Sequence, residues 1–551
     1  MVQEKAQKGR FYGAKFWWSP RKGRIFAAAM GFFGPATLEI YRFHQHFNDM
    51  LKRYSTILLA AAMSLAATSA QADDTVYKVG GINYQVISET AAMVAEQEGN
   101  EETLNGDIVI PATVTLGAKE YTVIAIDGTA FKNCTGITSM TLPSTIDSIC
   151  YQAFNGCTNM VSCNLEDTKI RELCVSTFLY CRSLRSITIP ATVTKIGINP
   201  FMETNSLAEI KLAPGNKCFK TYDGALYTIS GKTLISSPGG KTDLTLLDGL
   251  DTIANSAFCQ NRRIHNVTIP NSVTRIESSA FMRCDSLQLI TIPTSLTYLG
   301  SSAFADCRQA KGDLVLPASL KTMSSKCFYY TSITSMDASR CVDTSVPNSF
   351  VMYCTKLRTV KLPLTATQIW DNALNTVAIS EIDIPETVTR IRGSAMQGCT
   401  LLKKVTMGSK ITTLDFSVFA KDAALTEINI SAATPPSIGN SSRYPAFPDA
   451  VYTGCTLNVP AGSVDAYRAA DVWKNFTSIK TLGVASTGAD PDISVARTAD
   501  GLAVLGAPDG AAISVHAISG ALVYSGTDPV IALPAGLYIV RVAGRTFKVM
   551  K

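Results

Sequence analysis

Few residues in this sequence have the types and spacing that catalysis needs. After Ala72, the 551-residue chain contains only two histidines, His265 and His516. A Ser–His or Cys–His pair would therefore depend on His265 and a partner from a neighbouring segment. His265 stands beside Asn266 in a strand-like stretch, which favours an exposed strand residue over a catalytic base.

Two other patterns could support chemistry. The stretches 231–233 and 240–242 both read Gly-Lys-Thr, but neither has a glycine at the offset of a phosphate loop or a strand-to-helix context. Glu381 and Asp383 could act with acids of neighbouring segments as the carboxylate pair of a glycan-cleaving enzyme. We interpret the first pattern as turn tips and the second as a solvated strand. A periplasmic or secreted glycan-active enzyme with a β-helix-like body stays open as an alternative.

The 15 cysteines all lie between Cys134 and Cys455. Their number is odd, so at least one is unpaired, and no Cys-x-x-Cys motif suggests zinc. Stacked residues of one repeat phase have parallel Cβ directions, which is a poor geometry for disulfides. Free cysteine is usually buried, so we interpret these residues as small core side chains and expect no metal and no cofactor. Six share one phase of a repeat, namely Cys134, Cys157, Cys181, Cys284, Cys307 and Cys399.

That repeat is the main pattern in the sequence. The final apolar residues of thirteen short strand-like segments recur at intervals of 22–24 residues in eleven of twelve cases. Phe, Leu or Met follows most of them after twelve residues, as Phe281 follows Ile269. The two sets of apolar positions keep the same offset over about 290 residues, which indicates a solenoid with about 23 residues per turn. The segments end at Leu142, Leu165, Ile189, Leu212, Leu246, Ile269, Ile292, Leu316, Ala338, Leu362, Ile384, Met407 and Ile430.

Each repeat is predicted to have three sides. Ile187 and Ile189 alternate with Ser186 and Thr188, which is typical of a half-buried strand. Pro190 ends this strand because proline has no N–H for the ladder. A second short strand and a short helical turn carrying the phenylalanine complete the repeat. The predicted fold class is therefore mainly β with short helical turns, in a solenoid of about 23-residue units.

The side chain between the two inward residues of each strand faces outward. Solenoids present such faces as extended binding surfaces, although strand propensity also favours threonine there. We therefore predict a ligand-facing ladder of Thr188, Lys211, Thr268, Thr291, Asp337, Lys361, Asp383, Thr406 and Asn429.

Breaks in the repeat define the predicted domains. The interval between Leu212 and Leu246 is 34 residues, and we expect a hairpin near 220–240 that projects from the solenoid as a binding element or a tolerated insertion. Solenoid ends expose strand edges and need caps. The predicted parts are an N-terminal β cap at 73–124, the solenoid at 125–430, a C-terminal cap with Tyr467 and Trp473 at 431–482, a linker at 483–491 and a small β-sandwich at 492–551.

The N-terminal region has the pattern of a secretory signal peptide. Lys52 and Arg53 precede an Ala- and Leu-rich run, and Ala70-Gln71-Ala72 offers a cleavage site after Ala72. We therefore assign the signal peptide to 50–72 and interpret residues 1–49 as an upstream extension from a start codon placed too early, disordered if made. A membrane-surface anchor within residues 17–33 is the alternative. We expect no membrane span in the mature chain.

Two parts of the sequence carry family resemblances. The unit Ile-Pro-x-Ser-Val-Thr-x-Ile-x-x-x-Ala-Phe-x-x-Cys-x-x-Leu, nearly complete at 269–287, resembles the BspA-like leucine-rich repeat surface proteins of oral and gut bacteria. The likeness covers about residues 100–482 and implies an adhesin for host matrix proteins, glycans or other microbes. The stretch 533–549 resembles the C-terminal sorting domain of type IX secretion in Bacteroidetes, which implies passage across the outer membrane; an ordinary β-sandwich is the alternative.

Charge narrows the choice of partners. The formal net charge is +6, but residues 1–49 hold 8 Lys and Arg against 3 Asp and Glu, so the remaining chain is near neutral. A nucleic-acid-binding protein needs a clustered basic face, and we exclude this class. The expected function is a monomeric, exported surface protein that binds a host or microbial protein or glycan and has no enzymatic activity. A passive envelope scaffold is a further alternative.

Overall fold

The computed structural model describes residues 75–97, 103–439, 443–482 and 494–550, apart from 499, 506, 508–510, 519, 535, 543 and 544. The chain forms two compact units. Unit 1 is Met1–Thr204 with Lys211–Cys218, and unit 2 is Asn205–Ile210 with Phe219–Lys551. The predicted signal peptide and its cleavage at Ala72 lie outside the described residues. No helix among the described residues is long and apolar enough to cross a membrane.

Unit 1 opens with a mixed sheet and continues with short parallel strands. β1 and β2 form a hairpin, β3 runs parallel to β6, and β4, β7 and β9 form a second, parallel sheet. The strand predicted to end at Leu165 stops at Cys163, and Leu165 starts the 3-10 helix η1. The elements are β1 (Val76–Val79), β2 (Ile82–Val86), β3 (Ala91–Val94), β4 (Gly106–Val109), β5 (Thr113–Leu116), β6 (Lys119–Ile126), β7 (Ile137–Thr141), β8 (Ser148–Ile149), β9 (Ser162–Cys163), η1 (Leu165–Asp167), β10 (Glu172–Leu173), β11 (Ser186–Ile189) and β12 (Lys195–Ile196), while β13 (Glu209–Leu212) begins in unit 2 and ends in unit 1.

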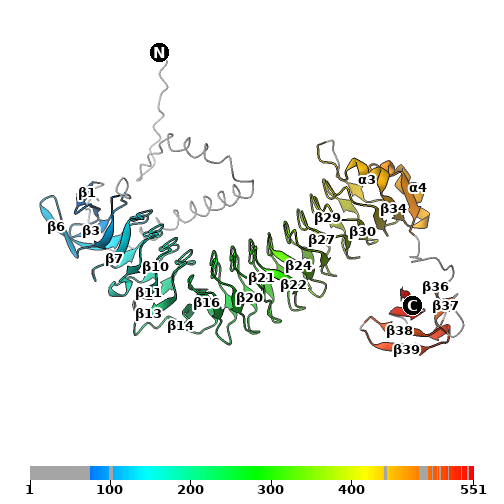
Figure 1. Cartoon of the computed structure of the whole chain (residues 1–551), viewed down its shortest axis with the longest axis horizontal. Helices are drawn as coiled ribbons and strands as arrows, with labels where there is room; N and C mark the ends of the chain where they lie inside the picture. The colour runs from blue at the N-terminus through cyan, green and yellow to red at the C-terminus, as the bar shows by residue number, and fades with distance from the viewer. Residues whose placement is uncertain are drawn as a thin grey trace, which may run out of the picture. The chain divides into compact units, whose positions relative to one another are not determined.

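Unit 2 confirms the predicted mainly β solenoid. Figure 1 shows its short strands side by side from turn to turn. Paired residues such as Arg275 and Tyr298, or Gln368 and Arg390, are 22–24 positions apart, so one turn takes about 23 residues. The first strand ladder contains β17 (Asp243–Thr245), β19 (Asn266–Thr268), β22 (Lys311–Val315), β24 (Ser332–Asp337), β26 (Thr359–Lys361), β28 (Glu381–Asp383), β30 (Lys404–Met407) and β32 (Glu427–Ile430). The second contains β16 (Thr233–Ser236), β18 (Thr252–Ile253), β20 (Arg275–Ile276), β21 (Tyr298–Leu299), β23 (Thr322–Met323), β25 (Ser345–Val346), β27 (Gln368–Ile369), β29 (Arg390–Ile391), β31 (Thr413–Leu414) and β33 (Ser437–Ile438).

The third side of each turn consists of tight turns, where the sequence predicts a short helical turn. Ala280 N–H donates to Glu277 O and Cys284 N–H donates to Phe281 O, which closes two turns with hydrogen bonds three residues apart. Ser279 and Arg283 have positive φ angles of 56° and 59° at the third position of these turns. A helix cannot form there because its residues need negative φ.

Contacts between neighbouring turns hold these left-handed residues in place. Arg283 N–H donates to Ala305 O, and Phe281 N–H donates to Ala303 O, so the third side also forms a parallel backbone ladder. The phenylalanine rings stack inside it. In unit 2, Phe281 lies 4.6 Å from Phe258 and 4.9 Å from Phe304 between ring centroids. The predicted stack of phenylalanines is confirmed.

The residues with positive φ angles provide a test of the turn conformation on the third side. Ser302 has a φ of 56°, and a β-branched side chain is strongly disfavoured there. Replacing Ser302 with Val is expected to destabilise unit 2 by about 1 to 3 kcal/mol, because strained dihedral angles cost that much. Urea denaturation measures the effect. Ser302→Gly is the control, since glycine adopts this φ freely, and equal losses for both variants would contradict the explanation.

The 34-residue interval contains three antiparallel strands. They are β14 (Phe219–Tyr222), β15 (Ala225–Thr228) and β16, and the last joins the second ladder by pairing with β18. The hairpin does not simply project from the solenoid, because Leu226 and Tyr227 are fully buried. Burial raises the pKa of Tyr227 to about 12. Ala225, Tyr227 and Leu234 belong to the apolar core of unit 2, so the insertion packs as part of the solenoid.

Aromatic residues close the far end of the solenoid. Trp473 and Tyr467 are fully buried. The Trp473 Nε1–H donates to Pro436 O at 2.8 Å, and the Tyr467 hydroxyl donates to Ala432 O at 3.0 Å. Both polar atoms are therefore satisfied inside the apolar cap. The elements here are α3 (Asp449–Gly454), β34 (Thr456–Val459), η2 (Ala461–Ser463), α4 (Val464–Ala469), η3 (Trp473–Asn475) and β35 (Ser478–Thr481).

The C-terminal residues form two antiparallel sheets. One has the order β36-β37-β40 and the other β39-β38-β41-β42. Buried side chains of both sheets, among them Leu502 and Val540, belong to one apolar cluster. The assignment of this module as a separate sandwich domain stays a prediction. The strands are β36 (Ser494–Arg497), β37 (Gly501–Leu505), β38 (Ile513–Ala517), β39 (Leu522–Gly526), β40 (Val530–Ala532), β41 (Leu537–Val542) and β42 (Arg545–Met550).

Candidate functional site

The first strand ladder carries most of the predicted ligand-facing residues. In unit 2 these are Thr268 on β19, Asp337 on β24, Lys361 on β26, Asp383 on β28, Thr406 on β30 and Asn429 on β32. Thr188 on β11 lies in unit 1, and Lys211 belongs to β13. Each is partly or fully exposed, since the alternating neighbours on each strand occupy the core.

The ladder is interrupted at Thr291. Residues 287–293 form no strand, so the predicted strand that ends at Ile292 is wrong. The pairing of the following strand, β22, with β24 shifts register between Gly312 and Asp313, and Gly312 has a φ of 99°. The outward face is therefore divided into shorter sheets.

Some ladder residues already bond to each other. Lys361 Nζ lies 3.0 Å from an Asp337 carboxylate oxygen. Burial tends to raise the pKa of Asp337, but hydrogen bonds from Ser339 and Lys361 outweigh it and lower that pKa. Asn458 donates to Asn429 at 2.8 Å. These contacts join neighbouring turns.

Five of the other ladder residues keep their side chains available. Within the described parts of the chain, Thr188, Thr268, Thr291, Asp383 and Thr406 form no side-chain hydrogen bond or ion pair. Hydroxyl and carboxylate groups in this position can bond to a ligand without first breaking an internal contact.

The alternative of a carboxylate pair for glycan cleavage gains no support at β28. Glu381 pairs in register with Lys404 on β30, and Lys404 Nζ lies 3.2 Å from Glu427. A lysine therefore stands between these acids of successive strands and forms an ion pair with one of them. Among the described residues, no group of three His, Cys, Asp or Glu side chains is placed to hold a metal ion.

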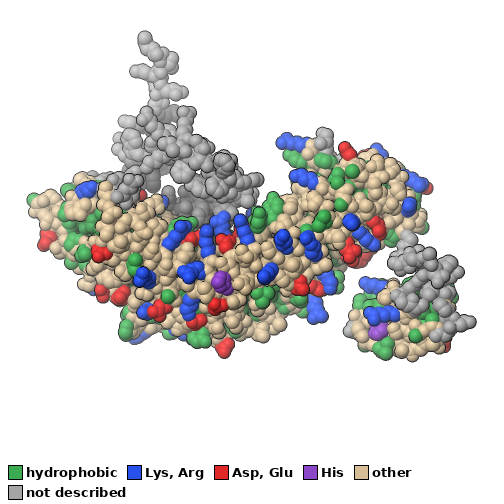
Figure 2. Space-filling model, viewed as in Figure 1, with side chains coloured by type: hydrophobic (Ala, Val, Ile, Leu, Met, Phe, Trp, Pro, Cys, Tyr) green, Lys and Arg blue, Asp and Glu red, His purple; other side chains and the backbone are tan. Residues whose placement is uncertain are grey.

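A pocket that the sequence analysis missed lies on the third side of unit 2. It has a volume of about 320 Å³. We call it the arginine pocket, because three of its six lining residues are arginines from three successive turns. Figure 2 shows Lys and Arg side chains gathered over the middle turns of this unit, between β16 and β24 in Figure 1. The lining residues are Arg262, Arg283, Asp285, Asp306, Arg308 and Gln309.

The charges in the arginine pocket are only partly paired. Arg308 Nη2 lies 3.1 Å from Asp306, whose side chain is almost fully buried. Arg262 Nε lies 3.9 Å from Asp285. Burial raises the pKa of Asp285, while the nearby arginines lower it by a smaller amount. Arg283 has no hydrogen bond or ion pair from its guanidinium to any residue that the structure describes.

A cluster of three tyrosines adjoins the arginine pocket. Tyr329, Tyr330 and Tyr353 form the tyrosine cluster, with ring centroids 5.6 to 5.8 Å apart. Arg308 connects it to the pocket, because its guanidinium lies 4.7 Å from the centre of the Tyr330 ring. The repeat phase of Arg283, Asp306 and Tyr330, each two positions after a phenylalanine, is the signal by which the sequence could have revealed this grouping.

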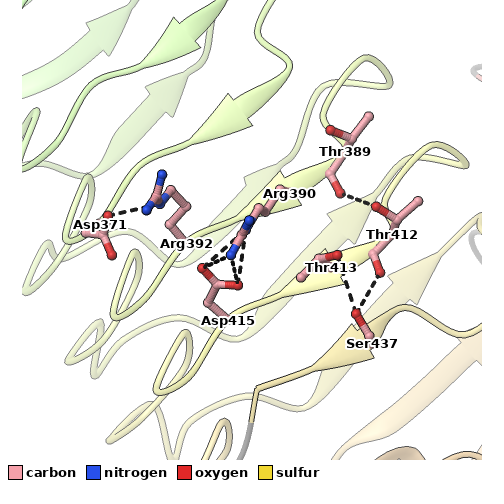
Figure 3. A network of polar contacts seen from close by, with 8 residues as sticks. All are labelled: Asp371, Thr389, Arg390, Arg392, Thr412, Thr413, Asp415 and Ser437. Carbon is pink, nitrogen blue, oxygen red and sulfur yellow. Dashed lines mark hydrogen bonds and ion pairs between the residues drawn. The ribbon is translucent and has the colours of Figure 1, made fainter.

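The second strand ladder carries a polar network that serves the fold. Figure 3 shows Arg390 on β29 donating through Nε and Nη2 to both oxygens of Asp415 in the next turn. Arg392 contacts Asp371 at 3.1 Å and stacks 4.2 Å from the Trp370 ring centre. Each pair links two turns, so these side chains hold the turns in register.

The stacked cysteines also have a structural role. All 15 cysteines are free, and the thiols in the shared phase lie in the core. Cys284 donates from Sγ to Phe258 O at 3.2 Å, and Cys307 donates to Phe281 O at 3.1 Å, each across to the preceding turn. Burial raises the pKa of Cys284 well above its ordinary value. These thiols are packed hydrogen-bond donors and not nucleophiles.

Comparisons with known proteins agree with this architecture. A family model described as the BspA type leucine rich repeat region matches six copies, over residues 116–223, 240–352 and 343–442, which together make up more than half of the chain. No curated protein matches this chain.

Solved structures of repeat proteins resemble it more distantly. A leucine-rich repeat protein from Bacteroides ovatus is 21% identical over 64% of this chain and 94% of its own, with a TM-score of 0.41. The pneumococcal vaccine antigen PcpA is 17% identical over 75% of this chain and 100% of its own, with a TM-score of 0.34. A leucine rich cell surface protein from Faecalibacterium prausnitzii is 22% identical over 66% and 96%, with a TM-score of 0.32.

Proposed function

This chain belongs to the BspA-type leucine-rich repeat family, and from this premise we propose that it is an exported, surface-displayed protein that binds a host or microbial protein or glycan. Leucine-rich repeat proteins typically bind partners and do not catalyse reactions. The observation that carries the proposal is the row of exposed, uncommitted side chains on the first ladder, including Thr268, Asp383 and Thr406. An extended face of this kind suits a macromolecular ligand.

Export and surface attachment belong to the same proposal. The signal-peptide pattern at 50–72 supports export, and the alternating strands of 533–549 support a sorting module. Antibody labelling of intact cells would test both steps, with cells that produce either the chain from Met50 or the same chain stopped at Ala485. We expect labelling of the longer chain only. Labelling of neither chain before the outer membrane is permeabilised would contradict surface display.

The ladder can be tested separately by adhesion. Replacing Asp337, Lys361 and Asp383 together with Ala is expected to lower adhesion to an extracellular-matrix or mucin-coated surface about tenfold, since a few central polar contacts dominate most interfaces. The fold should survive, because an exposed ion pair contributes at most about 1 kcal/mol.

The paired strands β10 and β12 of unit 1 offer a matched control. Glu172 and Lys195 form an exposed ion pair at 2.9 Å between two turns of unit 1. Replacing both with Ala removes a similar cross-turn pair away from the first ladder and should leave adhesion unchanged. If both variants adhere like the parent chain, the solenoid acts as a passive scaffold and the binding role of the ladder is wrong.

A further inference from the structure

The arginine pocket contains one guanidinium that acts on Asp285 only through its charge, without a hydrogen bond or an ion pair. Arg262 and Arg308 each face an aspartate of the pocket, whereas Arg283 forms no hydrogen bond or ion pair among the described residues. Its backbone is fixed, because its φ of 59° is held by the bond from its N–H to Ala305 O at 2.8 Å. An arginine with a fixed backbone and no ion pair of its own, placed between two paired arginines, can receive an anionic group from solution.

The charge of the pocket limits what that group can be. Three arginines and two aspartates give a net charge of +1. A single carboxylate would neutralise it. A dianionic phosphate, or a peptide with several acidic residues, would leave excess negative charge beside Asp285 and Asp306, which costs free energy. The pocket therefore fits a monoanion.

The other side chains that line the pocket, together with the tyrosine cluster, fit a sugar. Asp285, Asp306 and Gln309 have oxygens that can accept hydrogen bonds from hydroxyl groups, and both aspartates would repel a polyacidic chain. The tyrosine cluster adds apolar ring faces and phenolic hydroxyls, and Tyr330 is 41% exposed. Aromatic rings beside polar groups present the mixed surface that a sugar ring with one apolar face needs. A volume of about 320 Å³ is at the small end for ligand sites and suits one or two sugar residues.

We propose that the arginine pocket and the tyrosine cluster together bind an acidic sugar residue of a glycan. The sugar carboxylate pairs with Arg283, its hydroxyl groups bond to Asp285, Asp306 and Gln309, and the ring or its neighbour in the glycan lies against Tyr330. The inference rests on the proposed binding function, for which it names a ligand class. It places this contact on the third side of the solenoid and not on the first ladder.

Isothermal titration of the full chain tests the proposal with three sugars. Sialyl-lactose carries its carboxylate on a terminal sugar, a hyaluronan tetrasaccharide carries carboxylates within a chain, and lactose is neutral. At least one acidic sugar should bind and lactose should bind at least tenfold more weakly. Binding of sialyl-lactose alone assigns a terminal acidic sugar, and binding of hyaluronan alone assigns a uronic acid. Equal binding of lactose, or no binding of either acidic sugar, overturns the proposal.

Two variants and a control locate the site. R283Q removes the uncommitted charge and is expected to weaken binding of the acidic sugar at least tenfold. Y330A should weaken it several-fold. R263Q removes an exposed arginine next to Arg262 in the sequence that does not line the pocket, and it should keep the parent affinity. If R283Q and R263Q bind alike, the sugar binds elsewhere and the assignment is wrong.

The same measurements separate this inference from the proposed function. If a hexaglutamate peptide binds instead of the sugars, and R283Q weakens its binding, the partner is an acidic protein and the sugar proposal is wrong. If cells adhere through the first ladder while the purified chain binds no acidic sugar, the inference alone fails. If the purified chain binds the sugar with the expected loss in R283Q, but the chain never reaches the cell surface, surface display fails and the pocket assignment stands.

Discussion

Raising the pH from 5.5 to 8.5 is expected to destabilise the later turns of unit 2 by about 3 kcal/mol, through a single residue, Asp422. The side chain of Asp422 is fully buried. Burial raises the pKa of this carboxyl from 3.8 to about 8, although the nearby N–H groups of Cys399 and Gly398 lower it in part. In the folded chain Asp422 is therefore protonated at neutral pH.

The repeat explains why an acid can occupy this site. Asp422 stands three residues after Phe419, in the phase that Cys399 occupies one turn earlier. The Cys399 thiol donates to Leu374 O in its preceding turn at 3.2 Å. A protonated carboxyl also has one O–H to donate, whereas a carboxylate can only accept. The neutral acid thus occupies the position of a thiol in the repeat, and both of its oxygens are buried without a hydrogen-bond partner among the described residues.

The direction of the pH effect follows from proton binding. Between about pH 4 and pH 8 the folded chain holds one proton on Asp422 that the unfolded chain has released. Stability from this group is complete below pH 4 and is lost as the pH rises to about 8. Urea denaturation at fixed pH values, or hydrogen exchange of the turn at 415–425, would measure the loss.

Asp422→Asn provides the control for this prediction. The amide can donate a hydrogen bond but does not ionise, so the difference in stability between pH 5.5 and 8.5 should shrink by about 3 kcal/mol in the variant. Contributions from other titratable groups are common to both chains and cancel in the comparison. Parallel pH profiles for the parent chain and the variant would contradict a buried neutral Asp422.

Removal of one phenylalanine ring from the stack should have a comparable effect. Phe281→Ala is expected to destabilise unit 2 by about 3 to 5 kcal/mol, the usual cost of a large cavity in a packed core. Phe281 is 1% exposed and stacks on rings in both neighbouring turns, so its loss leaves Phe258 and Phe304 without a partner between them. The stack runs along the solenoid, so neighbouring turns cannot easily collapse into the gap.

Urea denaturation measures the effect, and Leu289→Ala is the control. Leu289 is 54% exposed, and truncation of an exposed side chain usually changes stability by less than about 0.5 kcal/mol. A loss below about 1 kcal/mol for Phe281→Ala would mean that the turns repack around the cavity and that the stack contributes little.

Much of the fold is predictable because a repeat makes tertiary contacts local. In parallel stacking, residues of equal phase lie on top of each other, so a period of about 23 residues places Phe258, Phe281 and Phe304 in one stack. The same argument identifies the buried cysteines, the outward residues and the aromatic cap. It fails where a turn departs from the average, as at Thr291, where the apolar spacing is kept but residues 287–293 form no strand.

The sequence by itself thus determined the solenoid, its period and the direction of most strand residues, since these follow from apolar spacing alone. Only the tertiary structure decided which polar residues satisfy each other and which stay available. Asp337 is paired with Lys361, whereas Arg283 is unpaired and shares a pocket with Asp306. The left-handed backbone at Arg283 and the side-chain directions of three successive turns form the pocket. Neither can be read from residue type and spacing.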